Sequence, residues 1–205
     1  HSLDRDKSGL ERTIQLIDSL KIPHAGTYIN TEERDKKYPL LLEKNGFRIA
    51  LLNYTYGTNG IPVTPPNIVN YIDTTVIAKD IEESKAMKPD AIIACMHWGI
   101  EYQSLPSKKQ KFLADWLLQK GVDHVIGSHP HVVQPIEVRE DSLTKEKHLV
   151  VYSLGNYISN MSARRTDGGL MVRMELVKDS TIRLNHCEYS FCLLYTSPSP
   201  RDRSV

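Results

Sequence analysis

The motif most suggestive of metal chemistry in this 205-residue chain has one histidine on each side of a proline. The motif, Gly127-Ser128-His129-Pro130-His131, directly follows residues 122–126, a short apolar segment that we expect to be a strand. Proline disfavours helical backbone at the residue before it, and residues two apart in an extended chain project to the same side. His129 and His131 are therefore predicted to converge on one zinc, iron or manganese ion, which neutral imidazole suits. The alternative is a pair of surface histidines on a loop.

A second polar cluster follows residues 91–96, another apolar segment that we expect to be a buried strand. The cluster reads His97-Trp98-Gly99-Ile100-Glu101. His97 is a candidate metal ligand or proton donor to a leaving group, and Glu101 is a candidate for orienting an imidazole or holding a water. An exposed carboxylate on a turn is the open alternative for Glu101.

A third expected strand, residues 148–154, is followed by Gly155-Asn156. The Asn156 amide is suited to ligating a metal or hydrogen-bonding an anionic oxygen, and the alternative is that it only accommodates the backbone of a turn. His97, Glu101 and Asn156 are thus the candidate catalytic residues. His124 lies inside the strand before the histidine motif, so we expect it to be absorbed by packing.

The elements that must position these residues alternate between helices and strands. Apolar residues recur at helical spacing in residues 9–21, 74–88 and 107–120. Apolar or alternating patterns predict strands at residues 47–54, 91–96, 122–126, 148–154 and 170–177, with a polar connection at 139–147. This order predicts an α/β fold, a layered sheet flanked by helices, with the site at the carboxyl ends of the strands.

Composition limits the classes of partner. The chain carries 26 Lys and Arg against 25 Asp and Glu, a formal charge of +1, so no strong field is present to recruit nucleic acid or an anionic membrane. No apolar run reaches the length of a membrane-spanning helix, so we expect no membrane segment in this chain. An anionic substrate must therefore be held by local contacts.

The two ends of the chain differ in character from its middle. Residues 1–190 are predicted to form one domain, and residues 191–205, rich in Ser, Pro and Arg, to be a disordered and non-native tail. The chain begins with His1 rather than Met and enters a helical pattern almost at once. We therefore expect the start of the natural protein to be missing.

These motifs resemble those of the CapA family of capsule poly-γ-glutamate synthesis proteins, whose fold is similar to that of calcineurin-like metallophosphoesterases. The resemblance runs from His1 to about residue 177. It rests on five segments: His1-Ser2-Leu3-Asp4, which is similar to the end of an Asn-His-x-x-Asp motif; Gly26; Met96-His97-Trp98-Gly99-x-Glu101; Gly121 to Val132, with its Gly-Ser-His-Pro-His core; and Tyr152-Ser153-Leu154-Gly155-Asn156-Tyr157.

The resemblance implies a divalent metal site of Mn, Fe or Zn type. Its histidine ligands would be His1, His97, His129 and His131, with Glu101 and Asn156 close by. Family members carry further acidic and asparagine motifs upstream of the position of His1. Those motifs are absent here, and no Asp at a strand end offers a bridge between two metals, so we expect at most one weakly bound ion.

The implied function is biosynthesis or processing of capsular poly-γ-glutamate by a metal-dependent hydrolase. Its substrate would be an anionic polymer or a phosphoester, and whether the bond cleaved is a phosphoester or an amide stays open. Capsule synthesis proteins are the implied partners. The implied location is the bacterial cell envelope, outside the cytoplasm, with membrane association through the missing N-terminal segment. The alternative, from another class, is a non-catalytic polymer-binding or scaffold subunit of the capsule machinery.

Overall fold

The computed structural model describes residues 1–179 and 181–193. The chain divides into two compact units. The first comprises His1–His97 and Trp116–Val125, and the second comprises Trp98–Asp115 and the described residues from Ile126 onward. The boundary between them falls within the helix α4 (Lys108–Gln119) and the strand β6 (His124–Ser128).

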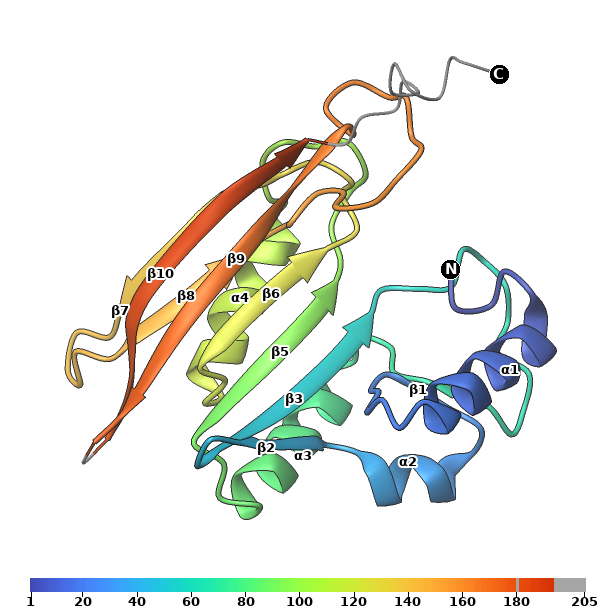
Figure 1. Cartoon of the computed structure of the whole chain (residues 1–205), viewed down its shortest axis with the longest axis horizontal. Coiled ribbons are helices and arrows are strands. Elements are labelled where there is room, and N and C mark those ends of the chain that lie inside the picture. Colours follow the sequence, from blue (N-terminus) through green and yellow to red (C-terminus); the bar gives the residue numbers. More distant parts are fainter. Residues whose placement is uncertain (180, 194–205) are drawn as a thin grey trace. The chain divides into compact units, whose positions relative to one another are not determined.

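Three strands of the first unit pair side by side. β2 (Leu40–Lys44) and β3 (Phe47–Thr55) are antiparallel, and β3 pairs in parallel with β5 (Ala91–His97) (Figure 1). Asn45 and Gly46 connect β2 to β3, and both have a positive φ, which is the backbone that a two-residue hairpin of this kind requires. The parallel pairing places the end of β3 beside the end of β5.

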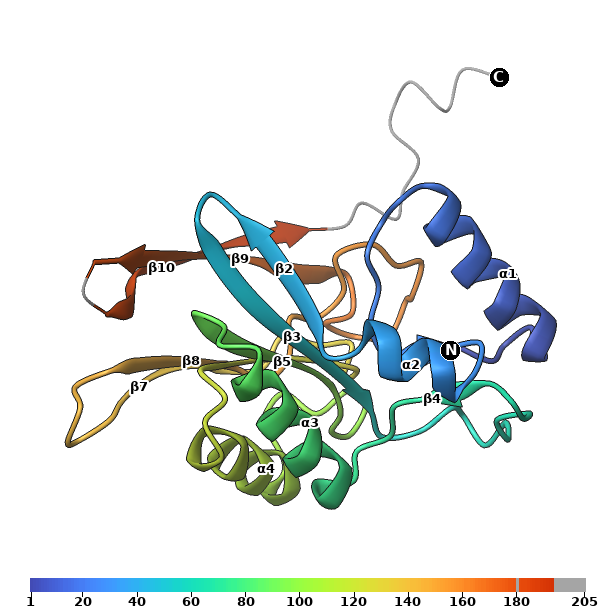
Figure 2. The ribbon, with the colours of Figure 1, turned by 90° about the horizontal axis from the view of Figure 1, so that it is seen from below.

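One helix of the first unit covers these strands and buries apolar side chains along one face. α3 (Thr74–Ala86) begins at Asp73, whose side chain accepts hydrogen bonds from the amides of Thr75 and Val76, and it buries Ile77 and Ile81. Figure 2 shows α3 against one face of β3 and β5. The remaining elements of this unit are α1 (Asp6–Ser19), β1 (Thr27–Tyr28), α2 (Thr31–Lys37) and β4 (Ile68–Val69).

Two antiparallel hairpins build most of the second unit. β7 (Ile136–Glu140) pairs with β8 (Lys147–Val151), and β9 (Gly168–Lys178) pairs with β10 (Ile182–Leu193). Leu149 and Val151 of β8 and Leu184 of β10 form the centre of an apolar cluster between the hairpins. A second shell of partly buried side chains packs against this cluster: Ile126, Ile136, Leu154, Val172, Met174, Leu176 and Cys187.

The second unit corrects two expectations. The segment expected to be a polar connection, residues 139–147, begins inside β7 and ends inside β8. The sequence pattern did not predict β7, because this short strand has few apolar residues and is stabilised by pairing with β8. β10 continues through Leu193, beyond the expected domain end at residue 190, because Phe191 to Leu193 pair with the start of β9. The rest of the expected tail lies outside the described residues.

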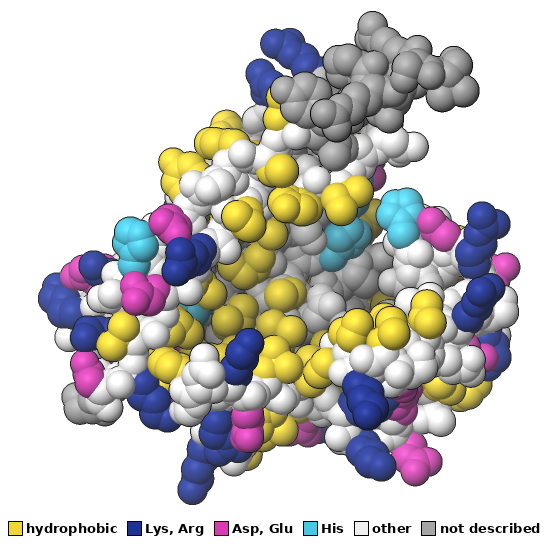
Figure 3. All heavy atoms as spheres, viewed as in Figure 1, with side chains coloured by type: hydrophobic (Ala, Val, Ile, Leu, Met, Phe, Trp, Pro, Cys, Tyr) yellow, Lys and Arg dark blue, Asp and Glu magenta, His cyan; other side chains and the backbone are white. Residues whose placement is uncertain are grey.

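The main sheet mixes parallel and antiparallel pairs and has the strand order β2-β3-β5-β6-β8-β7. Together with its helices it has the α/β character that the alternation predicted. Within residues 1–179 and 181–193, no helix combines the length and apolarity needed to cross a membrane. Figure 3 shows basic and acidic side chains interspersed on one face of the molecule, which agrees with the small formal charge.

Candidate metal centre

The backbone after β6 turns sharply at both motif histidines. His129 has a φ of 103° and His131 a φ of 60°, so the expectation of an extended His-Pro-His segment is wrong. Proline favours extended backbone with a negative φ at the residue before it, so His129 adopts its positive φ against this local preference. Two backbone hydrogen bonds hold this turn, from the Trp98 amide to the Ser128 carbonyl (3.1 Å) and from the Tyr102 amide to the Pro130 carbonyl (2.8 Å). Such strained backbone persists only where surrounding contacts hold it, and it is enriched at functional sites.

The turn brings the two imidazoles together despite this different backbone. The ring centroids of His129 and His131 lie 6.1 Å apart, with 56° between their planes. Gly127, two residues earlier, allows β6 to approach β8 closely, because a Cβ at this position would overlap the Tyr152 carbonyl oxygen. His129 and His131 thus lie close together, as the sequence predicted, but on a turn with positive φ angles instead of an extended segment.

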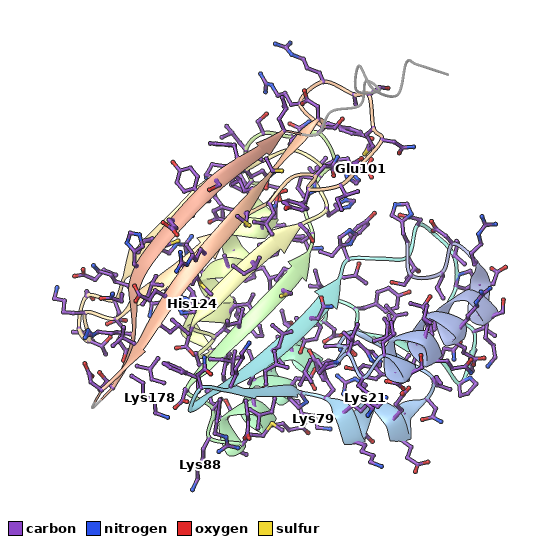
Figure 4. All side chains as sticks on the ribbon, in the orientation of Figure 1. Lys21, Lys79, Lys88, Glu101, His124 and Lys178 are labelled. Atoms are coloured by element: carbon purple, nitrogen blue, oxygen red, sulfur yellow. The ribbon has the colours of Figure 1, made fainter. Side chains whose placement is uncertain are left out.

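Glu101 joins the two histidines. One potential donor atom from each of Glu101, His129 and His131 lies within 4.8 Å of the other two. The Glu101 Oε1 atom is 3.9 Å from His131 Nε2. Glu101 lies in the loop between β5 and α4 (Figure 4). Its side chain is 45% exposed, so the residue is both a surface carboxylate and a candidate ligand.

This set of donors fits a single divalent ion. Ligands held at about 2.1 Å from one ion lie about 3 to 4 Å from one another, which is close to the spacing in the cluster. Two imidazoles with one carboxylate are a known ligand set for catalytic zinc and for non-haem iron, and both kinds of site leave coordination positions open. The half-exposed carboxylate leaves room for a further ligand on the solvent side.

Asn156 orients one of the imidazoles. Its Nδ2 donates to the Thr166 carbonyl oxygen at 2.9 Å, and its Oδ1 lies 3.0 Å from His131 Nδ1. Because an amide oxygen only accepts, His131 Nδ1 must be the donor, which leaves the lone pair on Nε2, the nitrogen near Glu101. The Tyr102 ring stacks on His131 with centroids 6.2 Å apart. Both ends of the Asn156 amide thus have partners, and the role that the contacts support for Asn156 is to orient the His131 ring.

Electrostatics favour the neutral form of His129. Partial burial lowers the pKa of His129, the neighbouring Glu101 opposes this shift, and His131 adds to it. A neutral imidazole is the form that ligates a metal, so the environment prepares His129 for binding at neutral pH.

The other predicted histidines lie in the first unit. His97 is the last residue of β5, with its Nδ1 2.9 Å from Thr55 Oγ1 and its ring stacked on Tyr56 at 5.7 Å. His1 is exposed, and its Nδ1 lies 2.7 Å from Asp4 Oδ2 and 3.2 Å from Asn59 Nδ2. That His1 and His97 join His129 and His131 around one ion stays a prediction.

Sequence reasoning missed three supporting residues, Thr55, Tyr102 and Thr166. Each acts through a contact that depends on tertiary pairing, and only the position of Tyr102 directly after Glu101 offered a local signal. His124 is 3% exposed, which confirms that it belongs to the core.

Two curated proteins resemble the chain over most of its length. The capsule biosynthesis protein CapA of Bacillus anthracis is 28% identical over 192 residues, which cover 90% of this chain and 44% of that protein. The PGA biosynthesis protein CapA of Bacillus subtilis (strain 168) is 28% identical over 187 residues, which cover 89% of this chain and 47% of that protein. The chain thus spans less than half the length of these relatives.

Solved structures confirm the fold class. The NAD nucleotidase NadN of Haemophilus influenzae matches with a TM-score of 0.57 and 14% identity, covering 94% of this chain and 38% of that one. The sulfate thiohydrolase SoxB of Thermus thermophilus matches with a TM-score of 0.50 and 14% identity, covering 89% of this chain and 30% of that one. At such identities the likeness concerns the fold alone, and it agrees with the α/β class.

The family model for the bacterial capsule synthesis protein PGA_cap matches residues 1–161. The matched range contains the His97 motif, the Gly-Ser-His-Pro-His motif and Asn156. Because the match covers well over half of the chain, the chain belongs to the PGA_cap family of bacterial capsule synthesis proteins.

Proposed function

We propose that this chain is the metal-binding part of a capsule biosynthesis protein and that it takes part in hydrolysis of an anionic polymer. The observation that carries the proposal is the cluster of Glu101, His129 and His131, whose donor atoms lie within ligand range of one another. Family membership and the capsule-related names of both relatives support the biological setting.

Each residue has a definite part in this scheme. His131 offers Nε2 because Asn156 holds its Nδ1 proton, and His129 is kept neutral by partial burial. Glu101 contributes the negative charge that offsets part of the charge of the cation. Glu101, His129 and His131 would hold a divalent cation, which would supply Lewis-acid chemistry for bond polarisation and for lowering the pKa of a water. His97 remains the proposed proton donor to the leaving group or a further ligand.

The proposed substrate is capsular poly-γ-glutamate or a phosphoester related to its synthesis. A formal charge of +1 gives no general attraction to a polyanion, so binding would depend on the cation and on local contacts. We place this activity at the cell envelope, outside the cytoplasm, with other capsule synthesis proteins as partners. The bond cleaved, a γ-glutamyl amide or a phosphoester, is what the assay must decide.

The test compares His131→Ala with His186→Ala, a control in the same unit whose side chain is 63% exposed on β10. Purified proteins are loaded with Mn²⁺, Fe²⁺ or Zn²⁺, and the bound metal is measured by mass spectrometry. We expect His131→Ala to lower metal content and hydrolysis together, because it removes a direct ligand, whereas even changes behind a ligand typically cost about 10 to 100-fold in affinity or activity. His186→Ala and the core variant His124→Ala should retain metal in whatever fraction is folded.

Two outcomes would change the proposal. Unchanged metal content in folded His131→Ala would remove His131 from the ligand set. Full metal occupancy without turnover of either γ-glutamyl or phosphodiester substrates would favour the scaffold alternative, in which the same residues hold a structural ion or bind polymer carboxylates.

A further inference from the structure

The register of two parallel strands places a hydroxyl beside the His97 imidazole. Thr55 is the last residue of β3, and its pairing partner in β5 is His97 itself. The Tyr56 amide donates to the His97 carbonyl at 2.9 Å, which locks the two strand ends together. The Thr55 Oγ1 atom consequently lies 2.9 Å from His97 Nδ1.

The hydrogen bonds of Thr55 determine which atom carries the proton. Its hydroxyl donates to the Gly57 carbonyl oxygen at 2.9 Å, and its Oγ1 accepts from the Gly57 amide at 3.3 Å. A hydroxyl has one proton and two lone pairs. Because a carbonyl oxygen cannot donate, the proton between Thr55 and Gly57 comes from Thr55, and the remaining lone pair of Oγ1 accepts from His97 Nδ1.

We propose that Thr55 is a positioning residue that holds His97 with its proton on Nδ1 and its lone pair on Nε2. Tyr56 supports the same ring pose, because its ring stacks on His97 with 26° between the planes. The inference about the tautomer rests on the first unit alone. Its consequence, that Nε2 is prepared to bind a cation, rests on the proposed function.

In the second unit, too, an oxygen acceptor lies beside the Nδ1 atom of a histidine. There, Asn156 Oδ1 accepts from His131 Nδ1 and leaves the lone pair on Nε2. Hydrogen bonding at the far nitrogen of an imidazole commonly sets the tautomer and orientation of a metal-ligating histidine. His97 and His131 are thus held in the same tautomer by unrelated elements, which is the form that ligation through Nε2 requires.

The first experiment reads the tautomer in the metal-free protein. Nitrogen chemical shifts of the imidazoles are recorded at about pH 8, where histidine is mostly neutral, and the His97 signals are assigned by their loss in His97→Gln. We expect the pattern of a protonated Nδ1 in the unaltered protein and in Thr55→Ser, which keeps the hydroxyl. In Thr55→Val the proton should redistribute between the two nitrogens.

The second experiment measures affinity for Mn²⁺ and Zn²⁺ by calorimetry. Thr55→Val is expected to weaken binding by about 10 to 100-fold, as changes behind a ligand do, and Thr55→Ser should restore most of the loss. Thr13→Val is the matched control, because Thr13 is exposed on α1 and its hydroxyl bonds only the Gly9 carbonyl among the contacts described for it. Thermal unfolding of each variant shows that it is folded.

The outcomes separate this inference from the proposed function. A protonated Nε2 in the unaltered protein, or an unchanged tautomer in Thr55→Val, overturns the role of Thr55 whatever the metal data show. Weaker metal binding in Thr55→Val with an unchanged tautomer also overturns it, since the loss would then come from packing. A protein that binds no metal defeats the proposed function, while the nitrogen shifts still decide the tautomer.

Discussion

At the scale of single residues, the candidate centre depends on groups that lie behind the candidate ligands. Asn156 is 9% exposed, and its amide is held from one side by the Thr166 carbonyl, which fixes which end of the amide faces His131. An amide flip would leave two acceptors facing each other at Thr166, so the orientation follows from the geometry. The tautomer of His131 therefore depends on Asn156, which lies 25 residues later in the chain.

Two variants of Asn156 separate its contacts. Asn156→Leu removes both the acceptor for His131 and the donor to Thr166, whereas Asn156→Asp keeps an acceptor for His131 and removes only the donor. Both should lower stability, by about 1 to 3 kcal/mol, because the buried Thr166 carbonyl loses its partner. Only Asn156→Leu should also weaken metal binding by about 10 to 100-fold. Calorimetric titration with Zn²⁺ checks this, and equal affinities for the two variants would refute the role of the Oδ1 contact.

At the scale of elements, β6 is the platform that presents the histidine motif. It can approach β8 closely because residue 127 has no side chain, and the Leu154 amide donates to the Gly127 carbonyl at 3.1 Å. The Trp98 indole occupies the adjacent space and donates to the Tyr152 carbonyl at 2.9 Å. The packing of the strands therefore helps to fix the position of the cluster formed by Glu101, His129 and His131, together with the loop that follows β6.

Gly127→Ala tests this dependence. The added methyl group would overlap backbone atoms of Tyr152, which cannot move as a flexible side chain does. Overpacking of this kind typically costs about 1 to 3 kcal/mol, and a shifted β6 should weaken metal binding as well. Gly57→Ala is the matched control, because a Cβ there meets nothing within 4 Å. Thermal unfolding and metal titration of both variants check the prediction, which fails if the two variants behave alike.

At the scale of the whole molecule, stability should depend on pH through buried tyrosines of the first unit. Burial raises the pKa of Tyr28 from 10.0 to about 12, and it raises the pKa values of Tyr38 and Tyr54 as well. The unfolded chain releases these protons at lower pH than the folded chain does. The free energy of unfolding should therefore be constant up to about pH 10 and fall as the pH rises from there.

Urea denaturation at a series of alkaline pH values measures this decline. Tyr28→Phe should make the decline shallower, because one of the coupled protons is removed. Tyr189→Phe is the control, since Tyr189 is 58% exposed on β10, and its slope should match that of the unaltered protein. A slope that Tyr28→Phe leaves unchanged would show that other groups cause the alkaline loss.

Metal binding should also appear as added stability. A ligand that binds only the folded state stabilises it by about 2.7 kcal/mol at a concentration of 100 times its Kd. For a chain of this length each kcal/mol corresponds to about 2 to 4 °C in Tm. Addition of Zn²⁺ or Mn²⁺ should therefore raise Tm by several degrees, chelation should reverse the rise, and Glu101→Gln should reduce it. A Tm that responds to neither metal would contradict a folded-state metal site.

Local sequence patterns were enough to predict many of the helices and strands. β3, β5, α3, α4 and β9 lie within two residues of their expected ranges, because apolar periodicity and caps such as Asp73 act over a few neighbouring residues. The sequence analysis did not predict β7 and β10, because these strands are stabilised by pairing with β8 and β9 and have no strong pattern of their own. Propensity is a weak guide wherever cross-strand contacts decide the structure.

The sequence by itself determined the candidate ligands, the strands that precede them and, through its motifs, the resemblance to the family, since these depend on residue type and short spacing. Only the tertiary structure decided how the ligands meet. The positive φ angles of His129 and His131 replaced the expected extended segment, and Glu101 came within reach of His131 across a loop. The partners that set the tautomers, Thr55 for His97 and Asn156 for His131, lie 42 and 25 residues from their histidines in the chain. Strand register and loop packing bring them together, and no local pattern encodes either.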